Sequence, residues 1–147
     1  MANGLVKNGL YSTQGGFTSN VAGLVRGVFV TPNYATKTVA VPGTDALRDV
    51  YFVQCDIDTP IELGQADRDY TLAQGVAVKM AKLQLGAKFV TTSLEAAIGT
   101  YAVGNVVMVS AAGKLKANVA GLFQATVTEV IASYDSEPAL LCVVTAV

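Results

Sequence analysis

The sequence predicts an all-β protein that folds as a single compact β-barrel or β-sandwich domain. Val and Thr, whose branched Cβ atoms favour strands, account for 22 and 14 of the 147 residues. Short apolar runs are separated by turn residues about every 8–12 positions, which is the spacing of sandwiches and barrels. The i, i+3, i+4, i+7 apolar pattern of a surface helix is missing from almost the whole chain.

Residues 1–20 are predicted to form an extended N-terminal arm, separate from a β domain at residues 21–147. The segment is rich in Gly, Asn, Ser and Thr, and its apolar residues follow neither the strand nor the helix period. It holds too little apolar area to fold alone. We expect either an arm that orders on a partner or a frayed terminus. Its candidate partner-binding residues are Leu5, Leu10, Tyr11 and Phe17.

The first three strands of the β domain are predicted over residues 24–31, 37–41 and 50–55. The first ends at a Pro-Asn pair and the second at Pro42-Gly43, a strong turn signal. The third alternates cleanly between its two faces. These boundaries and alternation favour short, half-buried strands.

A longer strand is predicted over residues 75–85, followed by a shorter one over 88–92. The apolar residues in the first half of the longer strand share one face, whereas Leu83 and Leu85 have the opposite parity. One extra residue near positions 81–82 would restore the phase. We therefore expect a β-bulge there.

The rest of the chain is predicted to hold one short helix and four strands. Residues 93–98 (SLEAAI) are the helical candidate, about a turn and a half long. Residues 106–110 and 114–117 form a hairpin around an Ala-Gly turn. The strand at 122–132 alternates apolar and polar residues. The strand at 138–147 is apolar on both faces, so we expect it at the centre of the core or under another chain.

Charged residues make up only 14% of the chain, against roughly 25% in an average soluble domain. A surface with so few charges is expected to be partly covered by another protein. The ten basic residues are spread thinly, so we expect no direct binding to nucleic acid. The sequence has neither an apolar run of transmembrane length nor a secretory signal within residues 1–20, so we expect no membrane partner and synthesis in the cytoplasm.

The sequence offers no group of residues for catalysis. Histidine is absent, which removes the commonest general base and most zinc sites. Asp56 and Asp58 would share one face of a strand, but no aromatic sugar cleft accompanies them. Residues 56–67 superficially resemble a calcium loop, yet Pro60 and Ile61 replace a ligand and the turn glycine. We expect no enzyme activity, cofactor or metal centre, with at most a loose structural cation site in this loop.

The two cysteines, Cys55 and Cys142, lie in apolar, strand-like surroundings far apart in the sequence. In a chain without a secretion signal, such residues are usually small buried hydrophobes. We therefore expect no disulfide between them.

Residues 101–115 read YAVGNVVMVSAAGKL. They resemble the Tyr-x-Val-Gly-Asp/Asn-x-Val and Gly-Lys-Leu hairpin of many small head decoration proteins of tailed bacteriophages. Residues 119–130 (VAGLFQATVTEV) resemble the strand that follows it. The resemblance implies a β-barrel or β-tulip-like domain. It also implies a homo-oligomer, often a trimer, that binds at junctions between major capsid proteins and clamps the expanded shell against internal DNA pressure.

The expected function is therefore that of a capsid decoration, or cement, protein on the exterior of a virion. A rigid β domain with an arm that orders on binding fits this role, because symmetric repetition multiplies weak contacts. A phage tail-tube or baseplate component is an alternative, for which residues 56–70 could be the long loop. A carbohydrate- or receptor-binding module is a third, although the chain has no Trp and only 7% aromatic residues.

Overall fold

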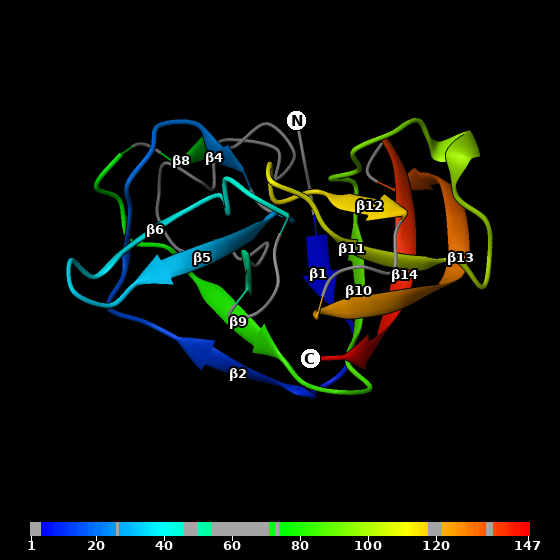
Figure 1. Cartoon of the computed structure of the whole chain (residues 1–147), viewed down its shortest axis with the longest axis horizontal. Helices are drawn as coiled ribbons and strands as arrows, with labels where there is room; N and C mark the ends of the chain where they lie inside the picture. Colours follow the sequence, from blue (N-terminus) through cyan, green and yellow to red (C-terminus); the bar gives the residue numbers. More distant parts are fainter. Residues whose placement is uncertain are drawn as a thin grey trace.

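The structure is a computed structural model that describes residues 4–25, 27–45, 50–53, 71–72, 74–117, 122–134 and 137–147. Nearly all regular structure in these residues is β. Two six-stranded sheets lie side by side (Figure 1) and pack together through a shared apolar core. The all-β prediction is confirmed. No helix in the described part of the chain is long and apolar enough to cross a membrane.

The first sheet combines strands from both ends of the chain, and every neighbouring pair in it is antiparallel. Strand β14 pairs with β10 on one side and β13 on the other, so it lies inside the sheet. Leu140, Cys142 and Val144 on one face of it are buried, whereas Leu141 and Val143 on the other face are half-buried. The sheet order is β1 (Gly4–Val6), β10 (Lys88–Thr91), β14 (Glu137–Ala146), β13 (Gln124–Tyr134), β11 (Val106–Val109) and β12 (Leu115–Ala117).

The second sheet is built mainly from the first half of the chain. Its pairs are antiparallel except for a short parallel pair at one edge, β3 with β6. The sheet order is β2 (Tyr11–Gln14), β9 (Met80–Leu83), β7 (Tyr51–Val53), β5 (Phe29–Asn33), β6 (Thr38–Ala40) and β3 (Thr18–Ser19). A separate two-stranded pair joins β4 (Leu24–Val25) to β8 (Thr71–Leu72).

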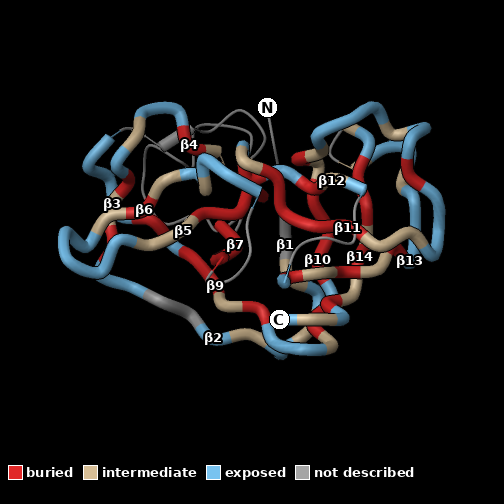
Figure 2. Tube along the Cα trace, viewed as in Figure 1, coloured by how far each residue is buried: buried red, intermediate tan, exposed pale blue. Residues whose placement is uncertain are grey.

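Four phenylalanines join the two sheets. The ring centroid of Phe29 lies 5.2 Å from those of Phe52 and Phe123 and 5.6 Å from that of Phe89. Phe29 and Phe52 come from the second sheet, whereas Phe89 comes from the first. Offset and edge-to-face contacts add to the apolar area that these rings bury. A second cluster of buried apolar residues, which includes Phe17, Val30 and Met80, draws on strands of the second sheet. Figure 2 shows buried stretches along β7 and β9 of this sheet.

The turn between β11 and β12 docks against the second sheet through the main chain. The Phe29 amide donates to the carbonyl oxygen of Gly113 over 2.8 Å, and the Gly43 amide donates to Ala111 over the same distance. Thr91 Oγ1 donates to the carbonyl oxygen of Gly27 over 2.7 Å and adds a buried link. Hydrogen bonds therefore hold the sheets together alongside the phenylalanine contacts.

The prediction of a separate arm at residues 1–20 is wrong for the residues of this segment that the structure describes. Residues 4–6 pair with β10, residues 11–14 with β9, and residues 18–19 with β6. The apolar content of this segment is too low to fold it alone, as expected from the sequence. Main-chain hydrogen bonds order the segment instead. β1 and β2 pair with strands more than 60 residues further along the chain, and β3 pairs with a strand 20 residues further along.

The helix expected at residues 93–98 is also wrong. The Leu115 amide donates to the carbonyl oxygen of Ser93, and the Glu95 amide donates to that of Leu115. These bonds form a parallel bridge between Leu94 and Leu115 and use main-chain groups that a helix would need. A single 3-10 turn, η2 (Ile98–Thr100), follows.

Two details of the predicted strands differ from the structure. β9 pairs with β2 in continuous register, so the bulge expected near positions 81–82 is absent, and the register shifts lie between β13 and β14. The run at 24–31 divides into β4 and β5 around Gly27, whose φ is 84°. The other predicted strands, including the hairpin of β11 and β12, are present with ends shifted by a few residues.

Candidate interaction surface

Two exposed leucines stand together where β9 turns into β10. Leu85 is 61% exposed and Leu10, on the turn between β1 and β2, is 42% exposed. Gly86 separates them, and a Cβ built on it would lie 3.4 Å from Leu10 Cδ1. The φ of Gly86, 85°, suits the third position of a type II turn and raises Leu85 to the tip. We call Leu10 and Leu85 the leucine knob.

The side chain of Asn8 fastens the two turns that carry the leucine knob. Asn8 Nδ2 donates to the carbonyl oxygen of Gly86 over 3.2 Å, and Asn8 Oδ1 accepts from the Lys88 amide over 3.1 Å. The Gln84 amide donates to the carbonyl oxygen of Leu10 over 3.0 Å. Because the turns are bonded to each other, the knob is presented in one geometry before any partner binds.

Lysines border the leucine knob. Lys7 and Lys88 are both exposed, and the Lys7 amide donates to the carbonyl oxygen of Lys88 over 2.7 Å. Neither ammonium group has an ion-pair partner in the described residues. The knob is therefore an apolar tip with a positive border.

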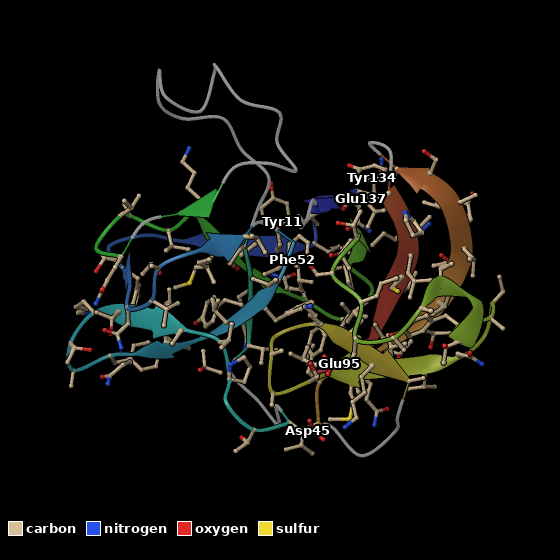
Figure 3. The ribbon with its side chains drawn as sticks, turned by 90° about the horizontal axis from the view of Figure 1, so that it is seen from above. Tyr11, Asp45, Phe52, Glu95, Tyr134 and Glu137 are labelled. Carbon is tan, nitrogen blue, oxygen red and sulfur yellow. The ribbon has the colours of Figure 1, made fainter. Side chains whose placement is uncertain are left out.

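A pocket of about 290 Å³ lies at the N-terminal end of β14, beside Glu137 and Pro138. Its lining is mixed: Leu94, Ala97, Ile98 and Pro138 contribute apolar groups, and Thr92 and Glu137 contribute polar ones. Glu137 is the first residue of β14 and pairs with Tyr134 across the β13–β14 hairpin, where the two side chains lie together (Figure 3). Its carboxylate has no ion-pair partner among the residues that the structure describes.

The four predicted contact residues have different surroundings. Leu10 is exposed in the leucine knob, whereas Tyr11 is half-buried and packs against the main core. Phe17 is 2% exposed inside the second cluster, so its prediction as a contact residue is wrong. Leu5 pairs through its backbone with Val90, and its side chain lies outside the described part of the structure.

Sequence reasoning missed Leu85 because it assigned this residue to the strand at 75–85. The adjacent glycine was the available signal, since an apolar residue just before a glycine that breaks a strand often lies at the tip of a turn.

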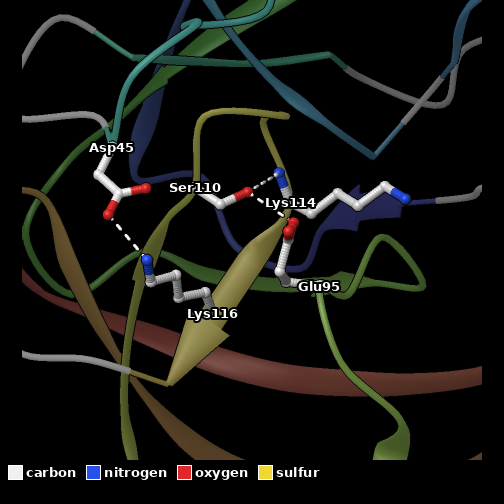
Figure 4. Close-up of polar contacts among 5 residues, drawn as sticks. All are labelled: Asp45, Glu95, Ser110, Lys114 and Lys116. Atoms are coloured by element: carbon white, nitrogen blue, oxygen red, sulfur yellow. Dashed lines mark hydrogen bonds and ion pairs between the residues drawn. The ribbon is translucent and has the colours of Figure 1, made fainter.

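A polar network holds the turn between β11 and β12 (Figure 4). Ser110 Oγ donates to Glu95 Oε2 over 2.9 Å and accepts from the Lys114 amide over 3.3 Å. Lys116 Nζ lies 2.7 Å from Asp45 Oδ2, and its hydrogen bond is the main cause of the lowered pKa of Asp45. These contacts position the turn against the second sheet and leave no open acid–base pair.

Two titratable groups of the core, Cys142 and Tyr101, are held in their neutral forms. Burial raises the pKa of the Cys142 thiol to about 12, and burial is also the main cause of the raised pKa of Tyr101. Cys142 is a free, buried cysteine, as predicted, whereas Cys55 lies outside the described residues. The acidic loop at 56–67, with Asp56 and Asp58, lies outside them too. The described residues contain no group of three or more His, Cys, Asp or Glu side chains that could hold a metal ion.

Comparison of the chain with protein-family models, curated proteins and solved structures finds no match.

Proposed function

We propose that this chain is a structural protein of a viral particle, a capsid decoration protein. It binds the outer surface of the shell at junctions between major capsid proteins and stabilises the expanded shell. The observation that carries the proposal is the segment at 101–115, whose residues resemble the hairpin of head decoration proteins. In the fold this segment supplies β11, the docked turn around Gly113 and the start of β12.

The physical character of the domain supports a structural role. Two sheets share one continuous core, so the domain can bear load without rearranging. Only 14% of the residues are charged, and large apolar side chains such as Leu85 and Val103 are more than 60% exposed. Exposed apolar side chains on turns that hydrogen bonds hold in place are suited to protein contacts. On a symmetric shell, many modest contacts of this kind combine into tight binding.

Binding to purified shells tests the proposal. Expanded, empty shells of the major capsid protein from the same genome are mixed with increasing amounts of this chain and sedimented. We expect binding that saturates at a fixed ratio to the capsid protein and raises the temperature at which the shells break. Unexpanded shells of the same capsid protein are the control, and they should bind less.

Absence of binding to expanded shells would overturn the proposal. Incorporation of the chain into rods would favour a tail-tube component, and a reproducible hit on a glycan array without shell binding would favour a receptor-binding module.

A further inference from the structure

The two ends of β14 carry features that complement each other. The leucine knob lies near the C-terminal end, where the Gly86 amide donates to the carbonyl oxygen of Val144 over 2.9 Å. The pocket lies at the N-terminal end, with Glu137 in its wall. One end therefore presents exposed leucines beside lysines, and the other presents a pocket with apolar side chains and a carboxylate. Within the described part of the chain, neither the lysines nor the carboxylate has an ion-pair partner.

These features cannot meet within one molecule. Val144 lies seven positions after Glu137 along an extended strand, which corresponds to roughly 24 Å at a rise of about 3.4 Å per residue. β14 is paired on both sides in its middle, at residues 140–143, and with β13 along most of its length, so it cannot bend to bring its ends together. The leucine knob of one molecule can reach such a pocket only on another molecule.

We propose that copies of this chain associate head to tail, with the leucine knob of one copy in the pocket beside Glu137 of the next. Leu85 fills the space between Leu94, Ala97 and Pro138, and Leu10 packs at its rim. Lys88 pairs with Glu137 of the neighbouring copy, which directs the contact because apolar burial alone has no direction. Contacts between two different patches close into a ring when the rotation allows and otherwise continue as a filament.

The proposal rests on the proposed function, in which the chain acts as an oligomer, and it names the contact between copies. It also fits the low charge of the chain, because each copy would cover an apolar patch on the next.

Analytical ultracentrifugation of the whole chain over a concentration series tests this contact. We expect wild-type protein to form a reversible oligomer. Leu85→Ser should raise the dissociation constant by about tenfold or more, because the apolar area of the leucine is no longer buried on association. Ala97→Phe, at an exposed position in the pocket, should block the knob to a similar extent without altering the core.

A charge swap makes the test specific. Lys88→Glu and Glu137→Lys should each weaken association by about three- to tenfold, as expected for a charge pair at the rim of an interface. The double variant, with the charges exchanged, should return to within about threefold of wild type. Val76→Ser and Lys37→Glu are matched controls, because both residues are exposed and their main chains bond to β3 at the edge of the second sheet, away from β14. Circular dichroism verifies that every variant is folded.

A folded wild-type chain that stays monomeric at all concentrations would overturn the head-to-tail contact. So would an oligomer that is unaffected by Leu85→Ser, or a charge swap that associates no better than the single reversals. Shell binding by a monomeric chain would refute this contact but not the proposed function. Oligomers that form through this contact but bind no shell would refute the proposed function and support the contact.

Discussion

Gly113 lies so close to Phe29 that no side chain fits between them. A Cβ atom built on Gly113 would overlap the carbonyl oxygen of Phe29, while the Phe29 amide donates to the carbonyl oxygen of Gly113 over 2.8 Å. The φ of Gly113 is 79°, a region that disfavours other residues. This glycine therefore allows the β11–β12 turn to hydrogen-bond to the second sheet.

Gly113→Ala is expected to lower the free energy of unfolding by about 2–4 kcal/mol, because a backbone carbonyl has to move and the backbone is strained. Urea unfolding followed by circular dichroism measures the change. Gly99→Ala is the matched control, since a Cβ there meets nothing within 4 Å. Equal urea midpoints for Gly113→Ala and Gly99→Ala would contradict the close approach of Gly113 to the Phe29 carbonyl.

Phe29→Ala is expected to cost about 3–5 kcal/mol of stability, the usual range for a buried phenylalanine. The loss should affect both sheets, because Phe29 touches rings from each of them. Hydrogen exchange should show faster opening in β7 and in β10 together. Tyr34→Ala removes an aromatic ring that is 54% exposed and should cost far less. Faster exchange in only one sheet would argue against a shared core.

Asn8→Ala should lower stability by about 1–2 kcal/mol, because two hydrogen bonds between neighbouring turns are lost. The Lys88 amide loses its acceptor, so its hydrogen exchange should accelerate in the folded protein. Asn20→Ala is the matched control, because Asn20 is exposed and its side chain has no hydrogen bond within the described residues. Unchanged protection of the Lys88 amide would show that Asn8 does not fasten the leucine knob.

Cys142 should resist alkylation in the folded protein. Its pKa of about 12 keeps the thiol protonated at pH 8, and its side chain is fully buried. Labelling with iodoacetamide in a Cys55→Ser background should follow the unfolding of the protein and become fast in urea. Rapid labelling without denaturant would show that the core around β14 opens locally.

The Asp45–Lys116 pair is expected to give a small stabilisation that acid removes. The pKa of Asp45 is lowered in the folded state, so the stabilisation is present above the ordinary value of 3.8 and is lost as the pH falls below it. Comparing wild type with Asp45→Asn between neutral pH and pH 3 tests this. The two proteins should differ at neutral pH and converge in acid, and added salt should also reduce the difference. A difference that grows in acid would contradict the pair.

The sequence by itself determined the β class, most strand positions and the hairpin of β11 and β12, because alternation and turn residues act over a few positions. It also indicated that β14 is apolar on both faces, and the structure places this strand inside the first sheet.

Only the tertiary structure decided which apolar residues are covered. Phe17 and Leu10 look alike in the sequence, yet one is in the second cluster and the other is exposed beside Leu85. Residues 93–98 have helical composition, but Leu115 takes their main-chain bonds. Pairing between strands far apart in the chain sets these outcomes, and local sequence patterns do not contain that information.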